Sequence, residues 1–565
     1  MVPADSFLIS AIMLSFADIV SSSDSTAHYA VPFVSGVLAH ICVFRIGEWD
    51  LRTTQLLVTF IAAQGLLGVY VWKAGQGDGI SVYEAWKAAA SVSFIFLSGI
   101  YSSILVYRGA FHRLNRFPGP FAARLSNFYV TRLSTKKNQL HQEVRKLHEQ
   151  YGDIVRIGPS ELSIADPALF HQIHSNSSPF VKGPWYNILH PVVSLQMIRD
   201  HKEHSRRRKT WDKGFGSKAL RDYEPRVARY TDELLGQIRA REGKAMNMSQ
   251  WFNFYSFDVM GDLAFGRSFD MLKEGVVHYF MEAVHTSMTA VGIFSHLVWI
   301  FPLFKETPGL NNDHLKFQTW LEQQVKQRRE NRPEVPDVFS WILGEYEALE
   351  KPTVQDTRNL VGDAHLIVVA GSDTTAASLT CLFYELARHP EVVAKIQQEI
   401  DAYHAERDDA DHLGLSKLKY LQACIDESLR LYPPVPSGVQ RMSPPSGQHI
   451  GDVFIPGNTI VQVPSYTLNR DARVYVQPDE FIPERWTTKP ELTKDASLLA
   501  PFSVGRYSCV GRQLGLMELR FVTSQVLRKY NVGFAKEYDA GTFQAGLQDS
   551  FTLATPKMDL VFTRR

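Results

Sequence analysis

The sequence predicts a mainly α-helical protein with small β-sheets, preceded by a helical membrane region. Apolar residues recur at helical spacing in several long stretches, among them 359–389 and 512–528. Near the N-terminus, Thr53–Trp72 and Ala88–Tyr107 each run for about twenty residues without Asp, Glu, Lys or Arg, long enough to cross a bilayer as a helix. At 565 residues, the chain exceeds one small domain but is compatible with a single large α-rich core.

The charge and cysteine content exclude several classes of protein. The net charge is +1, so no overall positive field favours nucleic acid, and we expect no nucleic-acid partner. Four cysteines are scattered along the chain without a CxxC or a His/Cys zinc spacing. This pattern argues against a disulfide framework and against a zinc site. The aromatic content of 12% suits a large apolar interior or pocket.

Two weaker apolar stretches precede the two strong ones. Ala30–Phe44 is short and contains His40, and Phe7–Val20 contains Asp18. A single stretch of this kind could be a buried helix, and a cleaved signal peptide is disfavoured because no basic residue precedes Phe7. We therefore expect residues 1–116 to form a membrane anchor of two to four transmembrane helices, with three as the central expectation.

The boundary after the last apolar stretch is marked by charge and by proline. Arg108, Arg113 and Arg116 follow it, so the positive-inside rule places the remainder of the chain in the cytosol. Phe117–Pro120, which reads Phe-Pro-Gly-Pro, predicts a stiff, helix-excluding hinge. The sequence therefore predicts a multi-pass membrane protein whose globular domain, residues 117–565, lies on the cytosolic side.

The first part of this domain predicts a helix, a hairpin and an irregular loop. Residues 139–151 form a charged helical pattern, and residues 154–164 read as two short strands around Gly158 and Pro159. Asp166 can cap the helix that follows. Residues 179–198 form an apolar loop, which is either an ordinary packed loop or a substrate-contact loop.

Residues 250–304 form a long, helical and unusually apolar region. Its last part, His285–Phe304, is almost uncharged and ends in Leu-Val-Trp-Ile-Phe-Pro. It could be another membrane span, or it could be a roof over an apolar pocket that dips into the lipid surface.

The helical pattern of 359–389 is interrupted at Ala370–Thr375, which reads Ala-Gly-Ser-Asp-Thr-Thr. Glycine is unfavourable inside a helix by about 1 kcal/mol relative to alanine. A threonine can bond the carbonyl four residues back, bend the helix and free a backbone group. A groove at Gly371 beside Asp373 and Thr374 offers room for O₂ and a path for protons; the alternative is a solvated bend in a core helix.

Phe502–Gly511 delivers one cysteine from a turn rich in glycine and small polar residues. Because a helical pattern begins at Arg512, Cys509 lies at or just before a helix N-terminus, where the macrodipole and free N–H groups are expected to lower the thiol pKa. Such a thiolate suits a soft metal centre that binds from one side. The alternative is a buried structural cysteine.

Charged residues with a scaffold pattern occur between these two motifs. Glu427 and Arg430 lie on one face of a helix, and Pro483–Trp486 reads Pro-Glu-Arg-Trp. A surface ion pair of this kind contributes under about 1 kcal/mol. Burying these charges is justified only if they pair fully.

Four motifs occur along the chain in the order Ala-Gly-Ser-Asp-Thr-Thr, Glu-x-x-Arg, Pro-Glu-Arg-Trp and the Cys loop. Together, and in this order, they resemble the motifs of the cytochrome P450 family over residues 117–565. The Cys loop resembles Phe-x-x-Gly-x-(Arg/His)-x-Cys-x-Gly, and it departs from this pattern at Tyr507, where the family has Arg or His and where Arg506 lies one residue early. The multi-span N-terminus, the segment Arg45–Asp50 and this departure resemble fungal biosynthetic P450s, and among those the tryprostatin B hydroxylase-like group.

The resemblance implies a cofactor, haem b, and a role for each motif. Cys509 is the implied axial ligand of the haem iron, and Asp373 and Thr374 are the implied proton-delivery pair. The other implied haem contacts are Phe502, Gly505, Gly511 and the propionate partners His204, Arg208 and Arg441, while Glu427, Arg430 and Arg485 are implied structural supports. Because Tyr507 is not a cation, charge compensation is expected from Arg208, Arg441 or Arg506. Pro434–Val439 and Ser550–Thr552 are expected to line the pocket.

The implied activity is that of a haem-thiolate monooxygenase of the endoplasmic reticulum that hydroxylates or otherwise oxidises a hydrophobic small molecule in a fungal secondary-metabolite pathway. The chain has no Gly-rich dinucleotide fingerprint, so the expected electron donor is NADPH–cytochrome P450 reductase, with cytochrome b5 as a further candidate. Two alternatives stay open: desaturation, ring coupling or isomerisation without net hydroxylation, and a non-catalytic haem-binding membrane protein.

Overall fold

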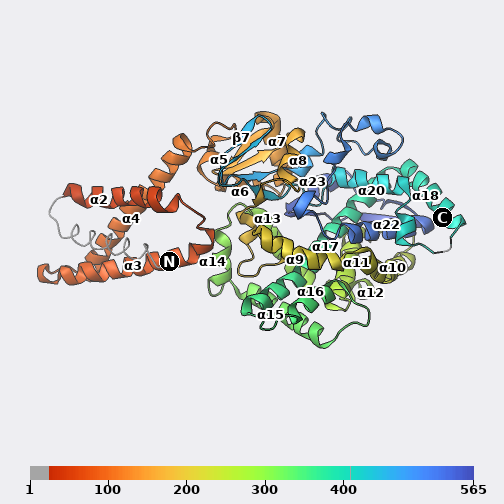
Figure 1. The fold of residues 1–565 in the computed structure, drawn as a ribbon, viewed down its shortest axis with the longest axis horizontal. Coiled ribbons are helices and arrows are strands. Elements are labelled where there is room, and N and C mark those ends of the chain that lie inside the picture. Colours follow the sequence, from red (N-terminus) through yellow and green to blue (C-terminus); the bar gives the residue numbers. More distant parts are fainter. Residues whose placement is uncertain (1–24, 408) are drawn as a thin grey trace.

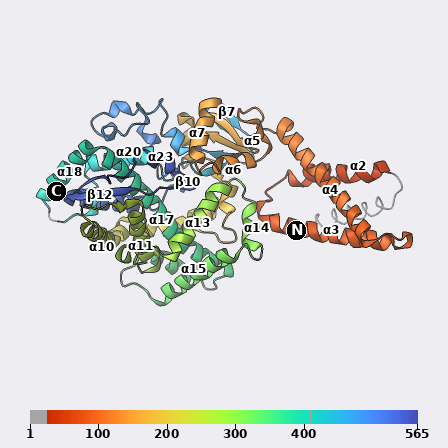
Figure 2. The same cartoon turned by 180° about the vertical axis from the view of Figure 1, so that it is seen from behind.

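The computed structural model describes residues 25–407 and 409–565, so the apolar stretch Phe7–Val20 lies outside the described residues. A helical arm extends from a globular body that carries the rest of the chain (Figure 1). The arm consists of α2 (Ser25–Ala39), α3 (Thr53–Ala74) and α4 (Val82–Val106), and α2 continues into the π-helical turn η1 (His40–Phe44). Seen from behind, the arm projects in the same way (Figure 2).

The arm carries the helices that the sequence predicts as spans. Residues Asp50–Ala74 and Val82–Phe111 are long and apolar enough to cross a membrane, and their apolar windows are mostly exposed. Tyr29–Phe44 is apolar but shorter. Helix α4 begins at Val82 rather than at Ala88 because Ser81 and Glu84 form a capping box, which satisfies the first backbone N–H groups. A third helix of sufficient length and apolarity, Val354–Arg388, is buried within the body and is therefore a core helix.

The base of the arm is fastened to the body. Helix α3 packs against α14 (Ile300–Glu306), and the two lie side by side in Figures 1 and 2. Beside them, Glu48 accepts two hydrogen bonds from the Arg199 guanidinium, at 2.6 and 2.7 Å. The Nε of Arg199 also donates to the backbone carbonyl of Lys182 at 3.2 Å. The segment that joins α2 to α3 is thus held against the body by an ion pair and by helix packing.

The Pro-rich hinge is also part of the body. The backbone N–H of Arg156, on strand β1 (Ile154–Gly158), donates to the carbonyl of Pro118 at 2.7 Å. Phe117 is buried in the same apolar cluster as the strands that follow. The segment is therefore not helical, as predicted, and it is packed against the body rather than free.

A mixed five-stranded sheet holds the first part of the domain in the order β1-β2-β8-β5-β3. The predicted hairpin is present as β1 and β2, which pair in antiparallel fashion from Ile154 opposite Ile164. Only β2 and β8 are parallel. The strands of this sheet are β1 (Ile154–Gly158), β2 (Glu161–Ile164), β3 (Val181–Lys182), β5 (Gln440–Met442) and β8 (Ile460–Gln462). Smaller sheets contain β4 (Met246–Asn247), β6 (Gln448–Ile450), β7 (Val453–Ile455), β9 (Tyr530–Phe534), β10 (Gln548–Ser550), β11 (Thr552–Ala554) and β12 (Asp559–Arg564).

Helices make up most of the body. The predicted region 250–304 is helical but divided, and α13 with α14 replaces the continuous apolar stretch His285–Phe304. The helices are α5 (Phe121–Leu125), α6 (Phe128–Ser134), α7 (Leu140–Tyr151), α8 (Phe170–His174), α9 (His201–Gly214), α10 (Ser217–Ala240), α11 (Met248–Phe265), α12 (Met271–Glu274), α13 (Tyr279–Phe294), α14, α15 (Asn312–Glu330), α16 (Val338–Glu347), α17 (Val354–Arg388), α18 (Pro390–Ala405), α19 (His412–Leu415), α20 (Lys419–Leu431), α21 (Ser465–Leu468), α22 (Arg512–Lys529) and α23 (Thr542–Gly546).

Helix α17 runs through the centre of the body and packs along α11. The predicted interruption at Ala370–Thr375 is wrong, because α17 is one continuous helix of 35 residues. Gly371 lies against Met260 of α11, where a Cβ would approach the thioether to 2.6 Å. The glycine therefore permits close helix packing, and this packing outweighs its low helix propensity. Met260 fills the space beside Gly371 on that side, but Gly371 and Thr374 also line the cavity at the centre of the body, where the expected groove is open.

Candidate active site

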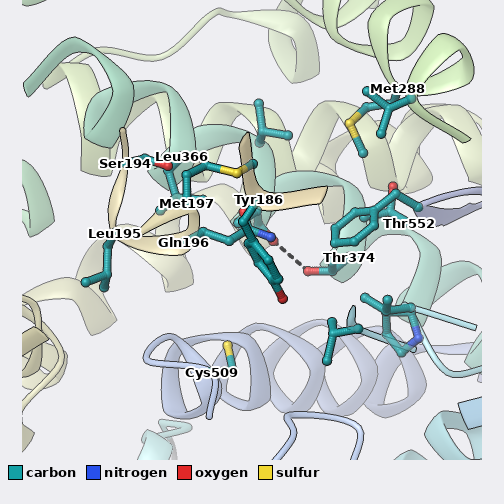
Figure 3. Close-up of a pocket in the computed structure, with 18 of the residues that line it drawn as sticks. Tyr186, Ser194, Leu195, Gln196, Met197, Met288, Leu366, Thr374, Cys509 and Thr552 are labelled. Atoms are coloured by element: carbon teal, nitrogen blue, oxygen red, sulfur yellow. Dashed lines mark hydrogen bonds between the residues drawn. The ribbon is translucent and has the colours of Figure 1, made fainter. Parts of the chain in front are cut away.

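A cavity of about 770 Å³ lies at the centre of the body, between α17 and the loop before α22. Segments far apart in the sequence line it, including the loop 182–197 and helices α9, α13 and α15. Cys509 projects into the cavity from one side and Thr374 faces it from α17 on the other (Figure 3). The structure thus places the motif Ala370–Thr375 and the Cys loop on opposite faces of the same cavity.

The Cys loop is held by backbone contacts. The N–H of Cys509 donates to the carbonyl of Phe502 at 2.8 Å, which closes the loop. Gly505 has a φ of +73°, and a Cβ there would lie 2.2 Å from the carbonyl oxygen of His174, so a larger residue cannot replace it without movement. Gly511 is the N-cap residue of α22. Phe502, Gly505 and Gly511 therefore shape the loop, and all three line the cavity.

The predicted lowering of the Cys509 thiol pKa is wrong for the chain alone. Burial raises the pKa of Cys509 above its usual value. The backbone N–H groups of Gly511 and Arg512 and the charges of Arg208 and Arg512 act in the opposite direction but offset only part of it. The helix N-terminus therefore contributes as expected, and burial of the thiol inside the protein outweighs it.

Three cations gather at one edge of the cavity: Lys182, Arg208 and Arg441. Lys182 and Arg441 are 3% and 2% exposed, and neither forms an ion pair within the described residues. Burial, followed by the charges of Arg441 and Arg208, holds the pKa of Lys182 well below its usual value. Its ammonium donates to the carbonyls of Leu195 and Gln196, at 3.3 and 2.7 Å. Buried cations without carboxylate partners are unfavourable, so this edge is suited to an anionic group.

The aromatic ring of Tyr507 packs against Lys182 and Arg441. The Arg441 guanidinium lies 4.9 Å and the Lys182 ammonium 5.0 Å from the centre of its ring, both within cation–π range. The Tyr507 hydroxyl is buried and has no hydrogen-bond partner among the residues that the structure describes. The Arg506 guanidinium lies 6.0 Å from the same ring, so the aromatic ring supports three cations where an arginine would add a further charge beside them.

The other expected propionate partners lie in different places. Arg208 lines the cavity and donates to the carbonyl of Ser508 at 2.7 Å and to Asp212 at 2.7 Å. His204 also lines it, and burial, followed by the charge of Lys182, lowers its pKa to about 3, so it is neutral near pH 7. Arg506 instead donates to the carbonyl of Asn176 at 2.6 Å and does not line the cavity. Arg208, Arg441 and His204 therefore line the cavity together, whereas Arg506 lies against the Tyr507 ring without lining it.

Thr374 and Asp373 point in different directions. The Thr374 hydroxyl donates to the carbonyl of Ala370 at 2.7 Å, the bond drawn in Figure 3. Asp373 is 8% exposed and lies 3.1 Å from Nε2 of His285 on α13. Burial lowers the pKa of His285, but the hydrogen bond and the charge of Asp373 outweigh it and raise the pKa above its usual value. His285 therefore connects the Asp373 carboxylate to helix α13.

The charged scaffold residues form one fully buried cluster. Arg430 donates to both oxygens of Glu427, at 2.8 and 2.9 Å, and Arg485 donates to Glu427 at 2.9 Å. Trp486 adds a fourth donor at 2.9 Å. The two guanidiniums use their remaining N–H groups on backbone carbonyls of residues 469–492, which lead into the Cys loop. Each buried charge is thus paired, as the sequence analysis requires.

Apolar side chains form the remaining wall. The loop 179–198 contributes Trp185 and Tyr186, and Trp185 stacks on Phe551 with ring centres 4.3 Å apart. Helix α13 covers the cavity as the predicted roof. Pro434, Val435 and Val439 line it from the segment after α20. The regions expected to line a pocket therefore do so.

Two residues of the site were not predicted from the sequence. Lys182 is a single lysine in an apolar loop, and its only local signal is the aromatic pair that follows it. His285 is one histidine in an apolar helix and gives no signal of its own. Both acquire their roles from long-range contacts that the linear pattern does not contain.

Comparisons with known proteins identify the family of the chain. The family model described as Cytochrome P450 matches residues 118–562. The chain is 59% identical to cytochrome P450 monooxygenase FCK2 of Fusarium pseudograminearum over 539 residues, which is 95% of this chain and 98% of that protein. It is 40% identical to cytochrome P450 monooxygenase phqL of Penicillium fellutanum, over 98% of each chain. It is 38% identical to tryprostatin B 6-hydroxylase of Aspergillus fumigatus, over 94% of this chain and 95% of that protein.

Proposed function

Because this chain belongs to the cytochrome P450 family, we propose that it is a membrane-anchored monooxygenase that hydroxylates a hydrophobic small molecule of fungal secondary metabolism. The observation that carries the proposal is the cavity with Cys509 on one face, Thr374 on the other and buried cations at its edge. The relatives support the pathway, since one is named as a hydroxylase of tryprostatin B, a small molecule.

The residues around the cavity fit haem, the iron cofactor of the family. Cys509 would hold the iron, and we propose haem b as the form. The two propionates would lie at the edge formed by Lys182, Arg208 and Arg441, because Lys182 and Arg441 form no ion pair within the described residues and Arg208 pairs only with the exposed carboxylate of Asp212. The unpartnered Tyr507 hydroxyl would donate to the same groups.

Haem, when bound, supplies the chemistry that inserts one oxygen atom of O₂ into a C–H bond, while the other leaves as water. The chain supplies position, exclusion of water and protons. Half-exposed His285 can take protons from solvent and pass them to Asp373, and the Thr374 hydroxyl can deliver them at the cavity face. The apolar roof and Trp185 exclude bulk water and orient the substrate.

We further propose the topology and the redox partner. Residues 1–116 form the anchor, with α3 and α4 as spans, and residues 117–565 form the catalytic domain on the cytosolic face of the endoplasmic reticulum. Electrons come from NADPH–cytochrome P450 reductase, with cytochrome b5 as a second candidate donor. The apolar arm and the positive charge after α4 support this arrangement.

The test is a reduced CO-difference spectrum of the purified protein, followed by turnover with reductase, NADPH and candidate substrates. A thiolate-type Soret band and ¹⁸O from labelled O₂ in the product are expected. Absence of the band contradicts the haem-thiolate assignment. A product without labelled oxygen would instead favour desaturation, ring coupling or isomerisation.

Replacing Thr374 by alanine is expected to lower product formation by about a hundredfold, because a positioned proton-transfer group contributes on that order. Haem binding, read from the CO spectrum, should not change. Thr380→Ala is the matched control, since Thr380 makes the same type of bond to a helix carbonyl, at 2.8 Å, but is buried away from the cavity. An equal loss in both variants would show that the hydroxyl acts through helix structure alone.

Replacing Arg208 by alanine is expected to lower haem retention, whereas Tyr507→Arg should leave it intact because other cations remain at the propionate edge. The measurement is the haem-to-protein ratio after gel filtration in dilute buffer. Arg206→Ala controls for charge on α9, since Arg206 is exposed and pairs with Glu203. Equal haem loss in the Arg208 and Tyr507 variants would contradict this assignment of the propionate partners.

A further inference from the structure

The outer part of the cavity is polar, although the cavity wall is mainly apolar. Lys305 of α14, His314 of α15 and His365 of α17 line it from three different helices. His365 precedes Thr374 by nine residues on α17, so the two are separated by about 13 Å along the helix axis. The polar group is therefore well removed from the face where Cys509 and Thr374 lie.

Lys305 brings an unmatched positive charge to this end. Its ammonium donates to the carbonyl of Ile188 at 3.0 Å and also to that of His190, and it forms no ion pair within the described residues. The only carboxylate that lines the cavity, among the residues that the structure describes, is Glu518 of α22, beside the Cys loop. Burial lowers the pKa of Lys305 to about 8, so the ammonium is mostly charged at neutral pH.

The two histidines add hydrogen-bond donors beside the Lys305 ammonium. His314 precedes Phe317 by three residues on α15 and shares its face, and the Phe317 ring lies 5.3 Å from the ring of His365. Burial, followed by the charge of Lys305, lowers the pKa of His314. Burial, followed by the charge of His314, lowers that of His365 to about 4. Within the described part of the chain neither ring forms a hydrogen bond to protein, so each neutral imidazole has an N–H to offer to a ligand.

We propose that Lys305, His314 and His365 bind an oxyanion on the substrate, a carboxylate or a phosphate, at the end of the cavity where His365 lies about 13 Å from Thr374 along α17. This inference rests on the proposed function, because it assigns the substrate of the same cavity. The substrate is then an elongated molecule with an apolar body and one acidic end. The acidic end fixes its direction in the cavity, with the apolar end toward Thr374.

A straight-chain acid of matching length is a suitable probe. An extended chain advances about 1.2 Å per bond, so dodecanoate spans about 13 Å and can reach both ends. Each sample is first shown to give the thiolate-type CO spectrum; failure at this step would count against the proposed function and not against the acidic-end site. Spectral titration then compares dodecanoate with its methyl ester and with dodecyl phosphate. Tighter binding of the phosphate or of the carboxylate identifies which oxyanion the site prefers.

Dodecanoate is expected to bind the wild-type protein about tenfold more tightly than the ester, as hydrogen bonds to charged groups allow. Lys305→Met and His365→Phe should each remove this preference and leave ester binding unchanged. Lys316→Met is the control, because Lys316 is an exposed lysine on α15 that does not line the cavity. Equal binding of acid and ester by the wild type, no spectral change with dodecanoate, or an equal loss for both probes in Lys305→Met would each overturn the inference.

Discussion

Replacing Cys509 by alanine is expected to abolish the thiolate-type CO band and all turnover, the largest effect of any single substitution in this chain. The Cys509 side chain is the one thiol that faces the cavity among the described residues. Cys381 and Cys424 are buried in the apolar core, so neither can take its place. The measurement is the reduced CO-difference spectrum together with haem content.

Cys42→Ala is the matched control for this substitution. Cys42 is exposed on the helical arm, far from the cavity, and its loss should leave the spectrum unchanged. A thiolate-type band that persists in Cys509→Ala would mean that the cofactor is held by another residue. The assignment of the Cys loop would then be wrong.

Replacing Glu427 by glutamine is expected to lower the free energy of unfolding of the body by about 3–5 kcal/mol, because it leaves two buried guanidiniums without their countercharge. Arg430 and Arg485 are both fully buried and converge on this carboxylate. The measurement is denaturant-induced unfolding followed by haem absorbance and by circular dichroism. Because residues 469–492 lead into the Cys loop, haem should be lost before the helices unfold.

An exposed ion pair provides the comparison. Arg332 and Glu347 pair at 2.7 Å near the surface, and Glu347→Gln should change the free energy of unfolding by less than about 1 kcal/mol. A similar small effect in Glu427→Gln would show that the buried cluster does not support the loop. The contrast between the two variants isolates burial as the cause.

Much of the fold could be predicted from local patterns. The hairpin β1–β2, the charged helix α7 and the long helix α17 follow from periodicity and turn residues, and each is present. The error at Ala370–Thr375 arose because glycine and threonine propensities are local. The contact of Gly371 with Met260 is a property of two packed helices and has no counterpart in the sequence of either helix alone.

The site was predictable where a residue is fixed by its own motif and not where it is fixed by distant contacts. Glu427, Arg430 and Arg485 converge as expected from their motifs. Lys182 becomes part of the cation edge only because β3 pairs with β5, which places it opposite Arg441. The direction of the Cys509 pKa was missed because burial by side chains from other segments outweighs the local helix end.

With the proposed topology, in which α3 spans the membrane, the contact between α3 and α14 and the Glu48–Arg199 pair beside it are expected to make the enzyme sensitive to bilayer thickness. A spanning helix that is longer or shorter than the hydrocarbon layer changes its tilt to match it. Since α14 rests on α3, a change of tilt is passed directly to the helix that carries Lys305 at the outer end of the cavity. Lipids of different chain length would therefore reposition the cavity mouth relative to the headgroups, without any ligand or modification.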